Sequence, residues 1–338
     1  MLKFLPSPIR GIIVFSFLFF NTIFWAIPIL TSGFIKFMMP LYSWRRKLDP
    51  VVVVFSSCWV FCNAQMFKFM HDIKWDVKGL ENLRPDGWYL VISNHQAWTD
   101  ILVLQTIFHN KIPFLKFFLK KELIWVPIMG LAWWALDYPF MKRYSSSYLK
   151  KYPHLKGKDI EITKKACEKF KYIPTSIMNF VEGTRFTSSK HNYQNSPYDN
   201  LLRPKAGGIG FVLAAMGYQL DAIINTTIAY PSCKNISFWQ FACGNIKEIK
   251  VNIEKITITK SMLGNYFEDP LFRVQFQSWI NALWSAKDKK IYEMLGVVQN
   301  FTDDNSEQET SNVFMPDFDK FIQSHNFDNV DKKEIDLN

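Results

Sequence analysis

The sequence predicts an α/β fold: a mostly parallel central sheet flanked by helices, preceded by an N-terminal pair of hydrophobic membrane-anchoring helices. Short apolar runs alternate with helical patterns after residue 68, which is typical of such a sheet. A long uncharged stretch near the N-terminus predicts the anchor. We therefore expect anchoring helices over 1–67, a main domain over 68–300 and an acidic, poorly ordered tail over 301–338.

The anchor is predicted from two uncharged stretches. The first, 11–35, has 25 residues and would form a helix about 37 Å long at roughly 1.5 Å per residue. No small-residue cleavage site follows it, which disfavours a signal peptide. The second, 50–67, is just short of a comfortable span, and "RRK" (45–47) before it favours the cytoplasmic leaflet. A single span with an interfacial helix and a hairpin within one leaflet both fit this pattern.

Within the main domain, apolar runs predict strands and helices in alternation. The strands are expected in 88–93, 173–183 (ending in a turn), 221–231 and 249–259, and the helices in 100–108 and 207–217. Beyond Pro270, an amphipathic helix would cover the sheet or lie on lipid.

The charge distribution narrows the class of partner. Residues 301–338 carry a net charge of −7, which leaves +17 on residues 1–300. A body this basic suits nucleic acid, an anionic membrane or a phosphorylated substrate, and the 17% aromatic content favours the membrane over nucleic acid. The five cysteines form no CxxC pair, so we expect reduced thiols facing the cytoplasm, and no metal site.

The segment "LVISNHQAWTDILVL" (90–104) carries the first candidate for chemistry. His95 and Asp100 are five residues apart, which is the wrong spacing for one helix face but suits a turn between a strand and a helix. Such a turn would let Asp100 orient His95 as a general base. The alternative is that Asp100 only caps the helix and His95 is a structural turn residue.

A second candidate, "FVEGTRF" (180–186), directly follows a strand. Arg185 is suited to two-pronged phosphate binding, and Gly183 allows backbone N–H groups to approach an anion. Glu182 would orient Arg185 or bind a substrate hydroxyl. Alone, the same residues also fit a tight surface turn.

Together, "NHQAWTD" and "FVEGTR" resemble the NHX4D and EGTR motifs of the glycerophospholipid acyltransferase family, the 1-acylglycerol-3-phosphate acyltransferases. The order matches, with the second motif about eighty to ninety residues after the first. "DYPFMKR" (137–143) and "IAYP" (228–231) loosely resemble two further blocks, although Met141 and Lys142 depart from the usual pair before Arg143. "LLRPKAGGIGFVL" (201–213) resembles the lysocardiolipin-acyltransferase-like bacterial branch.

The resemblance implies a glycerol-3-phosphate acyltransferase-like fold and a mechanism that needs no cofactor. His95 would deprotonate a lysophospholipid hydroxyl that attacks the thioester of acyl-CoA or acyl-carrier protein, while Asp100 holds His95 in place. Glu182, Gly183, Thr184 and Arg185, with Arg143, would bind and position the phosphorylated acceptor. The resemblance also implies a bacterial inner membrane, with the catalytic domain on its cytoplasmic side.

Residues 111–137 are rich in aromatic and basic side chains. Six aromatics fit either an acyl-chain groove or plain core: Phe114, Phe117, Phe118, Trp125, Trp133 and Trp134. Lys116, Lys120 and Lys121 would face headgroups or CoA phosphates, or form an ordinary solvated face. A non-catalytic lipid-binding protein and a lipid hydrolase are the alternatives to the acyltransferase.

Overall fold

A computed structural model describes residues 4–38, 42–141, 170, 173–231, 233, 236–266, 268–297, 316–325 and 327. Arg143, one of the residues expected to bind the acceptor, lies outside this range.

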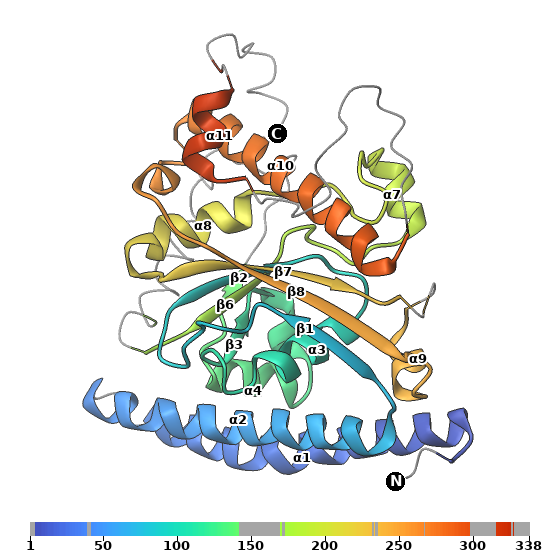
Figure 1. Cartoon of the computed structure of the whole chain (residues 1–338). Coiled ribbons are helices and arrows are strands. Elements are labelled where there is room, and N and C mark those ends of the chain that lie inside the picture. The colour runs from blue at the N-terminus through green and yellow to red at the C-terminus, as the bar shows by residue number, and fades with distance from the viewer. Residues whose placement is uncertain are drawn as a thin grey trace.

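A six-stranded sheet forms the centre of the molecule, in the order β1-β8-β7-β2-β6-β3 (Figure 1). Its strands are β1 (Lys74–Lys78), β2 (Tyr89–Ser93), β3 (Leu115–Phe117), β6 (Ser176–Phe180), β7 (Ala222–Ala229) and β8 (Glu248–Ile256). All neighbours are parallel except β7 and β8. Every residue of β2 and β7 is buried, because helices cover both faces of the sheet. The predicted fold class is confirmed.

Alternate residues of β2 point into two separate cores. Leu90 and Ile92 pack towards α8 (Gly207–Met216) and α10 (Pro270–Leu295). Tyr89 and Val91 pack on the other side, in the core that includes α3 (Thr99–Phe108). Smaller helices complete the layers: α7 (Ser188–Gln194), η4 (Gly217–Gln219), α9 (Phe238–Ala242) and η5 (Lys260–Leu263).

Helix α10 covers the sheet, which settles the choice between sheet and lipid. Its buried face includes Phe276, Trp279 and Trp284. The helix begins where the Asp269 side chain accepts a hydrogen bond from the Phe272 N–H, and it ends at Gly296, whose φ of 71° suits glycine. Within the acidic tail, helix α11 (Phe318–Ser324) packs on α10 through buried Phe318.

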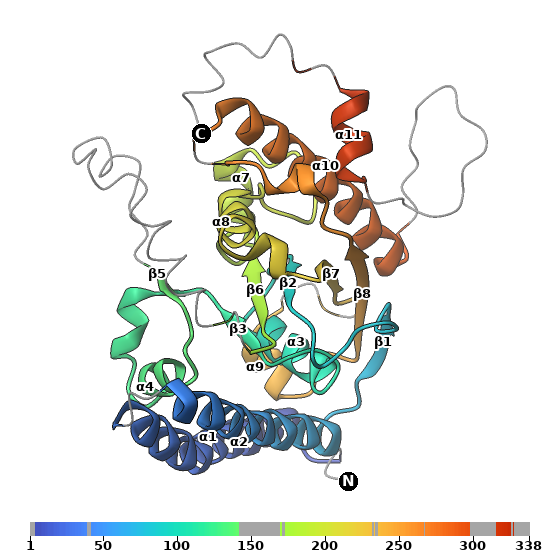
Figure 2. The same ribbon diagram turned by 90° about the vertical axis from the view of Figure 1, so that its left-hand side faces the viewer.

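Two long helices, α1 (Ser7–Met38) and α2 (Tyr42–Met70), lie side by side along the base of the body, opposite α8 and α10 (Figures 1 and 2). Both are long and apolar enough to cross a membrane. Asn21 donates to the Oδ1 of Asn63 over 2.8 Å, and the Trp59 indole donates to Thr22. Helix α2 begins at Tyr42, so the basic stretch expected between the helices forms the first turns of α2.

Residues 119–141, between β3 and β6, include a segment that packs against this helix pair. A short parallel pair, β4 (Leu119–Lys120) with β5 (Phe140–Met141), flanks η1 (Lys121–Trp125) and α4 (Met129–Ala135). A Cβ at Gly33 would lie 2.4 Å from the Cβ of Ala135, so glycine allows α1 and α4 to approach closely. Lys36 of α1 also pairs with Asp49 and Asp137.

Candidate active site

His95 and Asp100 come together at the carboxyl end of β2. The His95 Nδ1 lies 2.9 Å from the Asp100 Oδ2, which also accepts hydrogen bonds from the N–H groups of Gln96 and Ala97. These donors precede Asp100, so its carboxylate closes the turn rather than capping α3. Because Asp100 engages Nδ1, Nε2 is the ring nitrogen left to accept a proton.

Asn94 sets the position of this turn. Its amide donates to the Ile228 carbonyl and its Oδ1 accepts from the Ile228 N–H, each over 2.9 Å. The side chain therefore continues the pairing of β2 with β7 after the backbone of β2 has turned away. His95 consequently follows a point that is fixed to the middle of the sheet.

Tyr230 is a site residue that the sequence interpretation did not single out. Its hydroxyl donates to the Asp100 Oδ1 over 2.5 Å. Burial, together with the nearby Asp100 carboxylate, raises the pKa of Tyr230 well above its usual 10, so the hydroxyl stays protonated and remains a donor. The signal available in the sequence was the "IAYP" block, where this tyrosine directly follows a buried strand.

Glu182 stabilises the His95 turn through hydrogen bonds from backbone N–H groups. Its two oxygens accept from the N–H groups of His95 and Leu202, each over 3.0 Å, and only 1% of the residue is exposed. In the structure the side chain therefore positions the backbone of His95, and its role in positioning the acceptor stays a prediction. Burial raises the pKa of Glu182 to about 8, and the neighbouring Asp100 adds to the rise.

The next residues form an exposed turn tied to the same place. Gly183 has a φ of 70°, which glycine adopts without strain. The Phe186 N–H donates to the His95 carbonyl over 2.7 Å, and the Arg185 guanidinium lies 4.6 Å from the Trp98 ring centre. Arg185 is thus held next to the His95 turn with its charge accessible to an anion.

Lys190 adds a second cation that the sequence interpretation missed. Its Nζ donates to the Thr184 hydroxyl over 2.7 Å and to the Arg185 carbonyl over 3.0 Å. The residue lies in α7, eight positions after Glu182, and no periodic signal in the sequence links it to the turn. It brings additional positive charge to the expected phosphate-binding turn.

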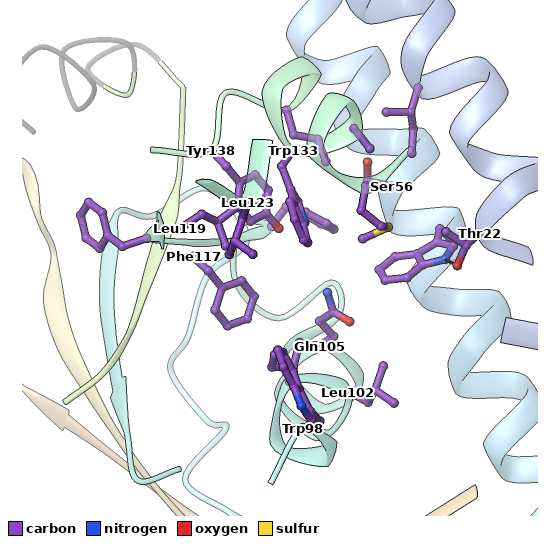
Figure 3. Close-up of a pocket in the computed structure, with 18 of the residues that line it drawn as sticks. Thr22, Ser56, Trp98, Leu102, Gln105, Phe117, Leu119, Leu123, Trp133 and Tyr138 are labelled. Carbon is purple, nitrogen blue, oxygen red and sulfur yellow. Dashed lines mark hydrogen bonds between the residues drawn. The ribbon is translucent and has the colours of Figure 1, made fainter. Parts of the chain in front are cut away.

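A cavity of about 640 Å³ lies beside His95, between the domain and the helix pair (Figure 3). This volume falls in the range of roughly 300–1,000 Å³ that is usual for ligand pockets. Its walls are mostly apolar, and Figure 3 shows Trp98, Phe117 and Trp133 from the domain facing Thr22 and Ser56 from α1 and α2. His95 and Phe180 are also in its wall, with their rings stacked 3.8 Å apart.

The aromatic side chains of 111–137 divide between cavity and surface. Phe114, Phe117, Phe118 and Trp133 line the cavity, as the groove interpretation required. Trp125 and Trp134 do not line it and are 85% and 40% exposed, so their assignment to the groove is corrected. Two lysines, Lys120 and Lys121, are exposed as expected. Lys116 is buried with its Nζ 4.7 Å from the Phe170 ring centre, so it does not face headgroups.

Helix α10 supports the site from the opposite face of the sheet. Asp288 accepts hydrogen bonds from the N–H groups of Asp199 and Asn200, and the Asn200 carbonyl accepts from the Gln96 side chain. Buried Lys287 donates to the Thr226 carbonyl in β7 over 2.7 Å. Burial lowers the pKa of Lys287 to about 7, against the smaller opposing effects of nearby carboxylates.

Comparisons with known proteins agree with this geometry. Residues 74–229 match the family model described as Acyltransferase. The matched segment contains the His95 turn, the Arg185 turn and the strands that carry them.

The matched relatives carry more specific names than the family model does, but their sequence identity to this chain is low. The human 1-acyl-sn-glycerol-3-phosphate acyltransferase alpha is 26% identical over 132 residues, 39% of this chain and 40% of that protein. The mouse gamma enzyme is 24% identical over 221 residues, 62% of this chain and 54% of that protein. The chain thus spans about half, or less, of the length of these curated relatives.

A solved structure shares the fold. The crystal structure of the 1-acyl-sn-glycerophosphate (LPA) acyltransferase PlsC from Thermotoga maritima aligns with a TM-score of 0.52 and 16% identity. The alignment covers 87% of this chain and all of that one. It therefore includes more of the molecule than the family match does.

Proposed function

We propose that the protein is a membrane-associated O-acyltransferase that moves a fatty acyl group from an acyl thioester to a hydroxyl of a lysophospholipid such as 1-acylglycerol-3-phosphate. One observation carries the proposal: the pair of His95 and Asp100 adjoins an apolar cavity of about 640 Å³, with Arg185 held beside the same turn. A base, an apolar chain site and an anion site are the three elements that this reaction needs.

The chemical step follows from the orientation of His95. Its Nε2 takes the proton of the acceptor hydroxyl as the oxygen attacks the thioester carbonyl carbon. Asp100 stabilises the resulting imidazolium and keeps the ring in the required tautomer. The carbon–sulfur bond then breaks, and the leaving thiolate takes the proton from His95, which restores the neutral ring. No acyl-enzyme forms in this sequence of steps.

The acceptor phosphate would bind at the exposed turn of Gly183, Thr184 and Arg185. Arg185 supplies a planar donor fork suited to phosphate. Lys190 binds the oxygens of Thr184 and Arg185, so it stabilises the turn and adds positive charge to it. Arg143 is retained from the sequence resemblance as a further phosphate-binding residue. Glu182 holds the backbone of His95 and thereby helps to position the acceptor against that residue.

The cavity, the helix pair and the basic charge also support the proposed substrates and location. The apolar cavity would take an acyl chain of the thioester, for which acyl-CoA and acyl-carrier protein are the two sources. The helix pair would hold the domain against an anionic membrane, on its cytoplasmic side and, in a bacterium, at the inner membrane. The basic charge of residues 1–300 supports contact with anionic lipid.

Purified protein in phospholipid vesicles, supplied with labelled acyl-CoA or acyl-carrier protein and a panel of lysophospholipids, tests the proposal. Mass spectrometry should find the label in a diacyl phospholipid, formed in equal amount to the released thiol. Label appearing only as free fatty acid would favour a hydrolase. Lipid binding without turnover of any pair would favour a non-catalytic lipid-binding protein.

A further inference from the structure

The segment from β4 to α4 has two apolar faces. One face lines the cavity through Leu123, Met129 and Trp133. The other face points outward and carries Trp125, 85% exposed, Leu131, 54% exposed, and Trp134, 40% exposed. Because large apolar side chains gathered on one exposed face mark an interaction surface, the outer face of this segment is expected to have a partner.

The outward side chains are concentrated at one turn. All four residues of the run 125–128, with the sequence WVPI, are exposed. Ile128 has a φ of 64°, a backbone conformation that a β-branched residue rarely adopts. The turn is closed by hydrogen bonds from the Val126 N–H to the Leu123 carbonyl and from the Gly130 N–H to the Val126 carbonyl. The backbone therefore holds this apolar turn in a defined shape.

The outer face is continuous with the helix pair. The Trp134 ring lies 5.6 Å from the Phe37 ring of α1 in an edge-to-face arrangement. Phe34, Phe37 and Met38 at that end of α1 are each about three-fifths exposed. The apolar surface of the helix pair thus continues onto α4 through Trp134.

The charges at the edge of this surface suit lipid headgroups. Lys120 and Lys121 are exposed four to five residues before the turn, with Glu122 beside them. Lysine stems cover apolar surface while their ammonium groups reach phosphate, and tryptophan favours the boundary between hydrocarbon and water.

We propose that the 125–128 turn and the outer face of α4 insert into the lipid bilayer next to the anchor. The bilayer is then in contact with the same thin wall that closes the cavity. On the proposed function, this wall is where acyl chains pass between the membrane and the cavity. Insertion into the bilayer does not require turnover, so the insertion and the proposed function can each be refuted without the other.

A fluorescent probe tests the insertion. An environment-sensitive fluorescent amino acid is placed at position 125, 193 or 218 of the full chain in phosphatidylglycerol–phosphatidylethanolamine vesicles. Tyr193 and Tyr218 are matched controls because each is 89% exposed and lies in α7 or η4, away from the helix pair (Figure 1). The probe at 125 should shift to the blue, be quenched by nitroxide lipids and be protected from iodide. The control probes should behave in the opposite way, and a probe at 125 that matches them would overturn the insertion.

A second arm tests passage through the wall. We expect Trp125→Glu to slow acylation of vesicle-embedded acceptor by about tenfold, because a carboxylate is costly to insert into lipid. The rate with a short-chain acceptor dissolved as monomers should change little, and Trp125→Phe should retain both activities. Equal losses with both acceptors would contradict passage at this wall while leaving the probe result to decide the insertion.

Discussion

Asp100 is the residue on which the candidate site depends most, because it binds four groups from two parts of the chain. His95, Gln96 and Ala97 lie just before it, and Tyr230 reaches it from the end of β7. The local part of this arrangement was predictable, since a strand, a turn and a helix start are all visible in the sequence. The bond from Tyr230 was not, because it joins residues 130 positions apart.

Replacing Tyr230 with phenylalanine tests the distant part of this network. A hydrogen bond to a charged group contributes about 1.5–3 kcal/mol, so Tyr230→Phe should lower kcat/KM about tenfold or more. The effect should fall on kcat, because Tyr230 acts through Asp100. Tyr218→Phe, at an exposed tyrosine, is the matched control. Unchanged kcat in the Tyr230 variant would show that Asp100 does not need this donor.

Glu182 predicts a particular pH dependence of stability. Its pKa is raised to about 8 in the folded state from 4.5, so the folded protein binds this proton more strongly than the unfolded chain does. The stability contributed by the group is complete below pH 4.5 and is lost as the pH rises through 8. Asp100 and Lys287 are the charged groups that act on it.

Glu182→Gln removes this titration. The variant should be less stable than the wild type, because the amide cannot accept from both N–H donors. Its deficit in Tm should be largest near pH 5 and should shrink as the pH approaches 8. Thermal unfolding of both proteins in detergent between pH 5 and pH 8 measures this difference in Tm. A deficit that stays constant across the range would contradict the assigned pKa.

At the scale of elements, α10 does more than cover the sheet. It lies outside the 74–229 family match, yet Asp288 holds the 199–200 backbone that in turn binds Gln96. The amphipathic pattern predicted this helix but allowed it either to cover the sheet or to lie on lipid, because an apolar helix face fits both surfaces equally well. The same ambiguity explains Trp125 and Trp134: an aromatic in a sequence does not reveal which side of a thin wall it faces.

Asp288→Asn should therefore affect catalysis from a distance. The amide keeps an acceptor oxygen but loses the negative charge and one set of lone pairs, so the 199–200 backbone should loosen. We expect a severalfold loss of kcat with little change in KM. Glu293→Gln, a change of the same type at a half-exposed position on the same helix, is the control. Equal activity of the two variants would show that α10 has no positioning role.

At the scale of the whole molecule, the helix pair is part of the candidate site as well as an anchor. Thr22, Ala26 and Ile29 of α1 and Ser56 and Trp59 of α2 line the cavity. The uncharged stretches predicted the helices from their length and composition alone. Their packing beneath the domain was beyond the sequence, because a single span and a hairpin in one leaflet require the same apolar residues.

Ala26→Phe tests whether α1 forms a wall of the acyl site. The added ring would project into the cavity, so the ratio of kcat/KM for long to short acyl donors should fall. Ile27→Phe is the matched control, because Ile27 is 64% exposed and does not line the cavity. A donor preference that moves equally in both variants, or in neither, would place the acyl chain elsewhere.

The most direct test of the central claim is the rate of acyl transfer by His95→Ala beside wild type, with the donor and acceptor that the panel identifies. General base catalysis contributes about 10²–10⁴-fold, so kcat should fall by that amount while the protein keeps its Tm. Tyr193→Ala, at an exposed position on α7, should match the wild type. Transfer by His95→Ala within a few fold of the wild type would contradict the account.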